Sequence, residues 1–494
     1  MTSPKTTSRN NKTSAPTPRC AARKNTKPPQ SSPLLRTRFS PSQLLGQFGH
    51  LLPLTLMASW LARSPKAFYL RAFTPLITLW YCVFQRLSDN HHLSYIVQDA
   101  RAGGADPLSP RGKALSRRLR SEATTSFSDA RQRLPLQIFH QSLWHTASRI
   151  SSSIQVPLWF GLKIALLDGS TTRLRPFGDI PKHFPAHRPG NCKKPPYWCI
   201  ARVLVLFCLA TGSVLDSAMG SLKASEQALS ALILKRCWQN WLLLADRNFG
   251  VYSVARATTA AKAHLLSRLT QSRAAKLARS ANVRLTPGLD TPLSWKPSSH
   301  DQCPQGLQPD PVAGRLLAAR IERPGFRSFT LYLFTTLLDS QAYSLQALVQ
   351  LYAQRWHVEV YLRYVKTQMD LDLLECRSAD MARKEWLAGL IAYNLIRWVM
   401  AAAAALAQVP VLTLSFSRAR ELFLGWCIRS WTRRPSLHSW KHLLHRIAKA
   451  RLPMRRKPRP PEPRAIRTFQ KDFAKLVGSR DQARKLLAAQ YANS

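Results

Sequence analysis

The sequence predicts an α/β fold with polar residues at the ends of buried strands. Three apolar runs have the length and composition of such strands, at 156–169, 199–212 and 240–250. In the first run the apolar residues end at Asp168, and in the third they end at Asp246. A helical stretch at 222–237 precedes the third run. Short apolar strands that alternate with helices are typical of an α/β sheet whose functional residues follow the strands.

The charge of the chain indicates its class of partner. Its 494 residues include 73 Lys and Arg but only 25 Asp and Glu, so the formal net charge is +48, and 45% of the residues are hydrophobic. This charge excludes an ordinary metabolic enzyme, because such self-repulsion needs a polyanion to neutralise it. DNA or RNA is therefore the expected partner.

The N-terminal part is predicted to contain two regions. Residues 1–40 are rich in Ser, Thr and Pro, with nine basic residues and no acid, which predicts a disordered basic arm rather than a signal peptide or membrane anchor. Residues 41–155 have apolar residues at three- and four-residue spacing, which predicts a helical domain. Because it is basic and adjoins the arm, we expect this domain to bind DNA.

The middle of the chain divides into three predicted parts. The first part of the core is 156–250, in which runs 199–212 and 213–220 form a hairpin through Thr211-Gly212. Residues 251–340 are predicted to be a β-rich insertion, with a basic helical piece, a Pro-rich loop at 285–312 and two strands at 312–323 and 326–336. The second part of the core, 341–440, begins with a helix from 345 to about 369.

Two patterns suggest alternatives to a soluble DNA-binding protein. Residues 74–84 and 386–408 are apolar enough to suggest membrane association, but Arg397 lies in the middle of the second, which favours a buried helix. A zinc site is conceivable at His183, His187, Cys192 and Cys199, but the spacing matches no standard finger and an ordinary basic loop is favoured. Nine cysteines without a Cys-x-x-Cys pair indicate a reducing compartment.

The C-terminal segment 441–494 has fifteen basic and three acidic residues around a Pro/Arg run. This composition predicts a basic tail that does not build a core and that faces nucleic acid. A solubilising tail without specific contacts is the alternative.

The scarce acids give the sharpest hypothesis about function. Asp168 and Asp246 each follow at least four apolar residues, and a carboxylate at such a position is costly unless a cation or hydrogen bonds compensate. Two such sites suggest a shared cation, although each Asp could instead cap the turn after its strand. On the following helix, four residues fall on one stripe about 60° wide, a face that can ligate a cation and grip phosphate: Tyr352, Arg355, Glu359 and Lys366. A salt-bridged surface helix is the alternative for this stripe.

Together these motifs resemble a known family. The spacing Tyr352-x2-Arg355-x3-Glu359-x6-Lys366 is that of the YREK signature of DDE transposases of the fourth insertion-sequence family. The blocks LLDGSTTRLRP, LLLADRNFG and IAYNLIRW also resemble that family, and the likeness covers roughly residues 110–480. One departure is Gln239-Asn240, where the family often has Gly-Asp.

The resemblance implies a ribonuclease-H-like catalytic core, interrupted by the β-rich insertion, preceded by the helical DNA-binding domain and flanked by the basic tails. It implies three catalytic acids that bind two Mg2+ ions, with Mn2+ as a substitute, namely Asp168, Asp246 and Glu359. Residues that contact DNA phosphates are expected at Tyr352, Arg355, Lys366 and Arg247.

The implied reaction is cleavage at the ends of an insertion sequence and joining of the 3′-hydroxyl ends to target DNA. The expected partners are double-stranded DNA, as terminal inverted repeats and target, and a second copy in a synaptic homodimer, in the bacterial cytoplasm at the nucleoid and without a membrane. The alternative is a catalytically inactive, repurposed DNA-binding protein, which the presence of all three acids disfavours.

Overall fold

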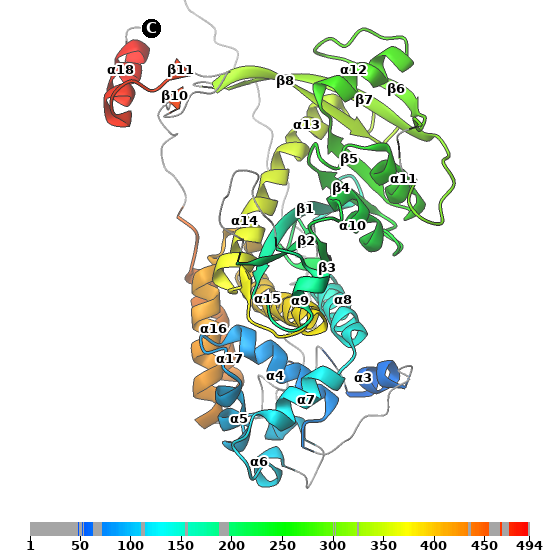
Figure 1. Cartoon of the computed structure of the whole chain (residues 1–494). Coiled ribbons are helices and arrows are strands. Elements are labelled where there is room, and N and C mark those ends of the chain that lie inside the picture. Colours follow the sequence, from blue (N-terminus) through cyan, green and yellow to red (C-terminus); the bar gives the residue numbers. More distant parts are fainter. Residues whose placement is uncertain are drawn as a thin grey trace, which may run out of the picture. The chain divides into compact units, whose positions relative to one another are not determined.

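The computed structural model (Figure 1) describes thirteen stretches of the chain, all within the unit Arg38–Ser494: residues 48, 52, 54–62, 72–109, 114–153, 157–186, 197–299, 301, 303–323, 326–432, 436–453, 465–466 and 474–492. The basic arm predicted at 1–40 lies outside the described residues.

The region before the sheet is helical, as the apolar spacing predicts. Its helices are α3 (Leu54–Leu61), α4 (Pro75–Leu87), α5 (Leu93–Arg101), α6 (Leu115–Arg118), α7 (Thr125–Arg133) and α8 (Leu136–Ser153), with a 3-10 turn η1 (Asp106–Leu108). Thr74 caps α4 by accepting from the Ile77 N–H, and every residue of this helix is buried. α4 and α8 both pack against α15 (Ala379–Ala407), so these helices share a core with the C-terminal half of the chain.

A single mixed sheet forms the centre of the described chain. Its strands are β1 (Lys163–Leu174), β2 (Cys199–Cys208), β3 (Val214–Ser221), β4 (Trp241–Ala245), β5 (His264–Arg268), β6 (Asp290–Trp295), β7 (Val312–Arg323), β8 (Phe326–Thr335) and β9 (Leu373–Leu374). They follow the order β3-β2-β1-β4-β5-β8-β7-β6, and β9 pairs with the far end of β1. β1, β2 and β3 are antiparallel, with β2 and β3 forming the predicted hairpin, whereas β4 and β5 run parallel to β1.

Helices beside the sheet bury the apolar side chains of its strands. α10 (Glu226–Ile233) contacts β2 and β3, and α11 (Tyr252–Ala260) and α12 (Gln271–Ser280) lie along β5, β7 and β8. Alternate residues Ala165 and Leu167 of β1 belong to the core cluster that contains the apolar residues of these helices. The intervening residues Ile164 and Leu166 are buried on the opposite face of β1.

The segment 251–340 differs from the prediction in two ways. The piece predicted to be one basic helix contains β5, because the centre of the run His264–Arg268 carries two leucines and lies buried beside β4. β6 occupies part of the predicted Pro-rich loop and pairs with β7. Since β8 pairs with β5, the strands of this segment extend the central sheet rather than form a sheet of their own.

The prediction that residues from 441 onward build no core is wrong for the first of them. α17 (Leu437–Lys449) buries Leu443, Leu444 and Ile447, at three- and four-residue spacing, and packs against α15 and α16 (Phe416–Thr432). Basic residues occupy its other face, and their number obscured the apolar stripe in the composition. Beyond it the structure describes β10 (Ala465–Ile466), β11 (Ala474–Lys475) and α18 (Arg480–Ala492).

The apolar run at 386–408 forms most of α15. By length and composition alone this helix could cross a membrane, but 83% of its apolar window is buried inside the protein. It contacts the N-terminal helices, α16, α17 and β3, so it is the central core helix of the described chain.

Candidate active site

Asp168 and Asp246 occupy equivalent positions on neighbouring strands. β1 and β4 are parallel, and Leu167 pairs with Ala245. Asp168 and Asp246 are the residues that directly follow this pair. Neighbouring strands lie about 4.8 Å apart, so the two residues come close together. β4 ends before Asp246 as predicted, but β1 continues past Asp168 to Leu174, where Asp168 pairs with Val205 of β2. The prediction that the first strand ends at Asp168 is therefore wrong.

The surroundings of Asp168 disfavour its charged form. Its side chain is 19% exposed, and one oxygen accepts a hydrogen bond of 2.8 Å from the Gly169 N–H. The pKa of Asp168 is raised to about 6, mainly by burial and in part by the charges of Asp246 and Glu226, against the lowering effects of the Gly169 N–H and Arg355. A carboxylate held in this way gains from a cation that binds beside it.

The segment that carries the other predicted site residues is not one regular α-helix. It consists of α13 (Leu345–Ala353), a 3-10 turn η2 (Gln354–Trp356), α14 (His357–Arg363) and a π-helical turn η3 (Tyr364–Gln368). The predicted single stripe assumed 100° per residue throughout, so it does not continue across these changes of pitch.

Arg355 connects two of the predicted catalytic acids. Its Nη1 lies 3.6 Å from Asp168 Oδ2, and its Nη2 donates to Glu359 Oε1 at 3.1 Å. Tyr352 lies beside it at 8% exposure, and burial raises the Tyr352 pKa to about 12, which Arg355 partly offsets. The structure thus places Arg355 against both Asp168 and Glu359, with Tyr352 beside Arg355.

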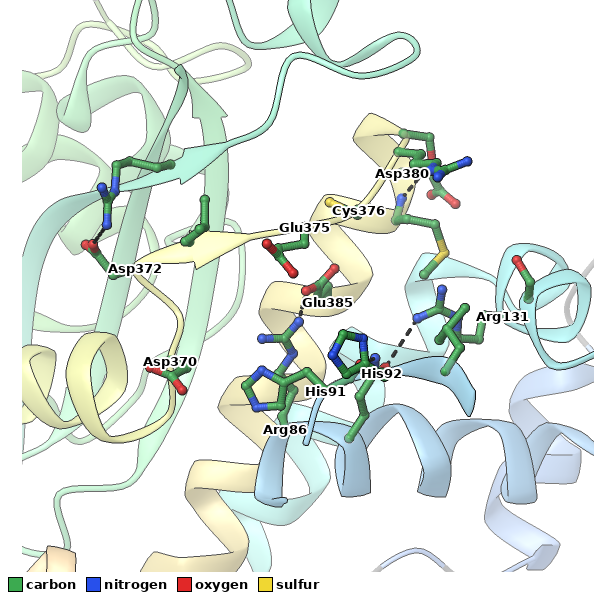
Figure 2. A pocket seen from close by; sticks show the side chains of 18 of the residues that line it. Arg86, His91, His92, Arg131, Asp370, Asp372, Glu375, Cys376, Asp380 and Glu385 are labelled. Carbon is green, nitrogen blue, oxygen red and sulfur yellow. Dashed lines mark hydrogen bonds and ion pairs between the residues drawn. The ribbon is translucent and has the colours of Figure 1, made fainter. Parts of the chain in front are cut away.

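Lys366 belongs to a different environment. Its ammonium pairs with Asp372 at 3.1 Å, and Asp372 also pairs with Arg173 near the far end of β1. These residues line a polar groove of about 1460 Å³ (Figure 2), whose other walls include Arg86, Glu385 and further residues of the N-terminal helices and of α15. The extra residue in the π turn alters the direction of Lys366 relative to Glu359.

The three predicted metal ligands do not form one closed group. Within the described residues, no cluster of three or more His, Cys, Asp and Glu has the spacing of a metal site. Asp168 and Asp246 adjoin, whereas Glu359 is half exposed and pairs with Arg355. Their chemistry nevertheless fits divalent metals, because hard ions such as Mg2+ prefer carboxylate oxygens. Arg247, directly after Asp246, is exposed and free to reach phosphate.

Comparison with known proteins finds a transposase domain in this chain. Residues 159–395 match the family model of the transposase DDE domain. Over 280 residues the chain is 24% identical to "Transposase InsG for insertion sequence element IS4" of Escherichia coli (strain K12), an alignment that covers 56% of this chain and 61% of that protein.

These two matches support an IS4-family DDE transposase. The family resemblance that the motifs predict is thus confirmed. All seven residues of the predicted site, Arg247 included, lie in the matched region. A solved structure, "Cryo-EM structure of piggyBac transposase synaptic complex with hairpin DNA (SNHP)", aligns with 86% of this chain and 88% of that chain at a TM-score of 0.38 and 13% identity. At that score the alignment supports no conclusion about the fold.

A network of hydrogen bonds that the sequence does not predict surrounds Asp246. The Asn248 N–H donates to Asp246 Oδ1 at 2.8 Å, while the Asn248 side-chain amide donates to Glu226 Oε2. Gln227 donates to both the carbonyl and the side-chain oxygen of Asn248 at 2.8 Å. Asn248 two residues after an Asp signals a turn, but nothing in the sequence links that turn to the start of α10.

Glu226 also approaches the strand that carries Asp168. A methyl group on Gly169 would lie 2.3 Å from a Glu226 oxygen, so the carboxylate of Glu226 packs directly against Gly169. The ion pairs within the described part of the chain include neither Glu226 nor Asp246, although the chain as a whole is strongly basic. The site therefore retains uncompensated negative charge.

The alternative zinc pattern is only partly visible. His187 and Cys192 lie outside the described residues. His183 pairs with Asp179 at 3.6 Å, and Cys199 is buried in β2. Each of the two described residues thus has an ordinary structural environment.

Proposed function

We propose that this protein is an active DNA transposase that cleaves the ends of an insertion sequence and joins the 3′-hydroxyl ends to target DNA. The match to the transposase DDE domain supports DNA transposition as the process. The observation that carries the proposal is the position of Asp168 and Asp246 directly after the paired residues Leu167 and Ala245 of two adjacent parallel strands, with Arg355 linking Asp168 to Glu359.

We further propose a ribonuclease-H-like core. The order β3-β2-β1-β4-β5, antiparallel in its first half and parallel in its second, supports this assignment. β6, β7 and β8 would then be the inserted strands, joined to the core through the β5 and β8 pair.

Asp168, Asp246 and Glu359 are the residues that would hold two divalent metal ions, Mg2+ or Mn2+ in its place. Such ions, when bound, activate an attacking hydroxyl and stabilise the leaving oxygen in phosphodiester transfer. Asp168 and Asp246 come from rigid strands and supply a fixed pair of carboxylates. Glu359 has to exchange its ion pair with Arg355 for the metals, and its half-exposed position allows that movement.

The basic residues would bind and orient the DNA. Arg355 supplies a planar guanidinium that can grip a phosphate with two parallel hydrogen bonds once it releases Glu359. Tyr352 is protonated at neutral pH, because its pKa is about 12, and can donate its hydroxyl proton to a phosphate oxygen. Arg247 and Lys366 extend this contact, the second in exchange for its ion pair with Asp372.

The remaining parts of the proposal concern partners and location. The helical region before the sheet would contact the inverted repeats, and two copies would hold two DNA ends in a synaptic homodimer. We place the protein in the bacterial cytoplasm at the nucleoid, where DNA can neutralise its positive charge.

Nicking of supercoiled plasmid DNA with Mg2+ tests this function. We expect the wild type to nick the plasmid and Asp246→Asn to lose at least about two orders of magnitude in rate. Asp310→Asn is the matched control, because Asp310 is exposed, pairs with Arg256 and lies away from the acids. Equal nicking by the wild type and Asp246→Asn would sink the assignment of Asp246, and DNA binding without nicking by the wild type would favour a repurposed DNA-binding protein.

A further inference from the structure

Arg397 is a buried cation in the middle of α15. It is 2% exposed, and four aromatic rings surround its guanidinium, with ring centroids 4.9–5.5 Å from Cζ. These rings, which we call the arginine box, belong to Tyr361, Tyr364, Tyr393 and Phe416. They come from three segments far apart in the sequence: α14 with its π turn, α15 itself and α16.

The hydrogen bonds of Arg397 leave its charge without a counterion. Its Nε donates to Tyr393 Oη at 2.8 Å, and Tyr393 Oη donates to the Gly212 carbonyl at 2.7 Å. Its Nη2 is buried without a hydrogen-bond partner, and among the described residues no carboxylate lies within 4.0 Å of it. Gly212 has φ +67°, and a Cβ there would lie 2.7 Å from the Arg397 Cζ, so the hairpin turn fits tightly against the cation.

Burying an arginine side chain at this position costs free energy. A buried charge without a counterion loses its hydration, and aromatic faces return only part of that loss. Apolar side chains of similar volume often replace buried charged groups without loss of stability. The box would therefore be at least as stable around a methionine, so stability alone does not account for Arg397.

The arginine box is attached to the helix that carries Glu359. Tyr361 lies two residues after Glu359, about 200° around α14, so the box holds the face opposite the carboxylate. Tyr361 Oη donates to the Leu209 carbonyl at 3.0 Å, and the Leu209 N–H donates to the Ile164 carbonyl of β1 at 2.9 Å. This chain of contacts connects the helix of Glu359 to the strand of Asp168.

We propose that Arg397 is a positioning residue that fixes Glu359 relative to Asp168 through the arginine box. Its planar guanidinium fixes the tyrosine rings on either side of it, and Tyr361 transmits that placement to β1. The π turn begins at Tyr364, one of the box residues, so the box also holds the helix where its pitch changes. This inference rests on the proposed function of Glu359.

The first test is Arg397→Met in the full-length protein. We expect its thermal unfolding midpoint to equal or exceed that of the wild type, while plasmid nicking slows about 10- to 100-fold because Glu359 is misplaced. The Mn2+ concentration for half-maximal binding, followed by electron paramagnetic resonance, should rise by about 10-fold. Arg315→Met is the contrasting control: Arg315 is 1% exposed but pairs with Asp290, so its loss should lower the unfolding midpoint.

A second variant decides the matter if Arg397→Met does not fold. Tyr361→Phe keeps the ring and removes only the hydrogen bond to Leu209, so it should fold and should raise the Mn2+ requirement in the same direction. Tyr252→Phe is matched to it, because Tyr252 in α11 donates a similar bond of 2.7 Å to the carbonyl of Asp310, which precedes β7. Its Mn2+ requirement should stay at the wild-type value.

The outcomes separate this inference from the proposed function. Wild-type nicking and Mn2+ binding in folded Arg397→Met or in Tyr361→Phe would overturn the role of the arginine box. A loss of activity in Arg397→Met that only matches its loss of folded protein would do the same. If Glu359→Gln itself nicks DNA at the wild-type rate, the proposed function fails instead.

Discussion

Replacing Asp168 with asparagine is expected to stabilise the metal-free protein at neutral pH. The pKa of Asp168 is about 6 in the folded protein, against an ordinary value of 3.8, and the main cause is burial. Ionisation therefore costs more in the folded state than in the unfolded chain. Two pKa units correspond to about 3 kcal/mol, which is the upper limit of the cost because the side chain is 19% exposed.

The direction of the pH dependence follows from proton binding. Between pH 4 and pH 6 the folded protein holds a proton on Asp168 that the unfolded chain has lost, so this group makes the free energy of unfolding fall as pH rises. Below pH 4 both states are protonated and the cost disappears. Asparagine removes the cost, so Asp168→Asn should gain up to about 3 kcal/mol at pH 7.5 and little at pH 4.

Urea unfolding in EDTA, followed by circular dichroism at both pH values, measures this difference. Asp310→Asn removes an exposed charge that pairs with Arg256, so its effect should stay within about 1 kcal/mol at both values. Our account of Asp168 fails if Asp168→Asn is less stable than the wild type at pH 7.5, or if its gain is the same at pH 4.

Three further predictions concern binding, packing and the site network. DNA affinity, measured by fluorescence anisotropy, should fall by about 10³- to 10⁵-fold between 50 and 200 mM salt if six to ten phosphates are neutralised, and a flat response would contradict the role of charge. Leu444→Ala should lower the free energy of unfolding by about 2–5 kcal/mol, because Leu444 is 1% exposed; no loss in a urea titration would contradict the core role of α17. Asn248→Ala should raise the Mg2+ concentration for half-maximal nicking by about 10-fold, since it removes the side-chain hydrogen bonds that tie this turn to Glu226 and Gln227, and an unchanged requirement would refute this.

The strands of the sheet could be predicted where apolar runs are long. β2 and β4 are buried almost throughout, and their sequences contain little besides apolar residues. The sequence does not predict β5, because Ala, Lys and Arg on both sides of its short apolar centre favour a helix. Its pairing with β4 on one side and with β8 on the other decides its conformation. α17 was missed for a related reason, since its basic face dominates the composition of 441–494.

The position of a site residue could be predicted where the chain around it forms a regular strand or helix. Asp168 and Asp246 could be paired because apolar runs of similar length place them at the same level of the sheet. Lys366 could not be placed, because the π turn before it breaks the regular pitch that the prediction assumed. The role of Asn248 depends on its contact with Glu226, which lies 22 positions earlier in the sequence, and the segment between them carries no signal of that contact.

The central claim is that Asp168, Asp246 and Glu359 together bind divalent metal, for which Glu359 exchanges the ion pair that it forms with Arg355. Mn2+ titration of the purified protein, followed by electron paramagnetic resonance, tests it most directly. We expect Asp168→Asn, Asp246→Asn and Glu359→Gln each to weaken Mn2+ binding by at least about 10-fold, with Asp310→Asn unchanged as the control. Wild-type Mn2+ affinity in Glu359→Gln would place Glu359 outside the metal site and contradict the account.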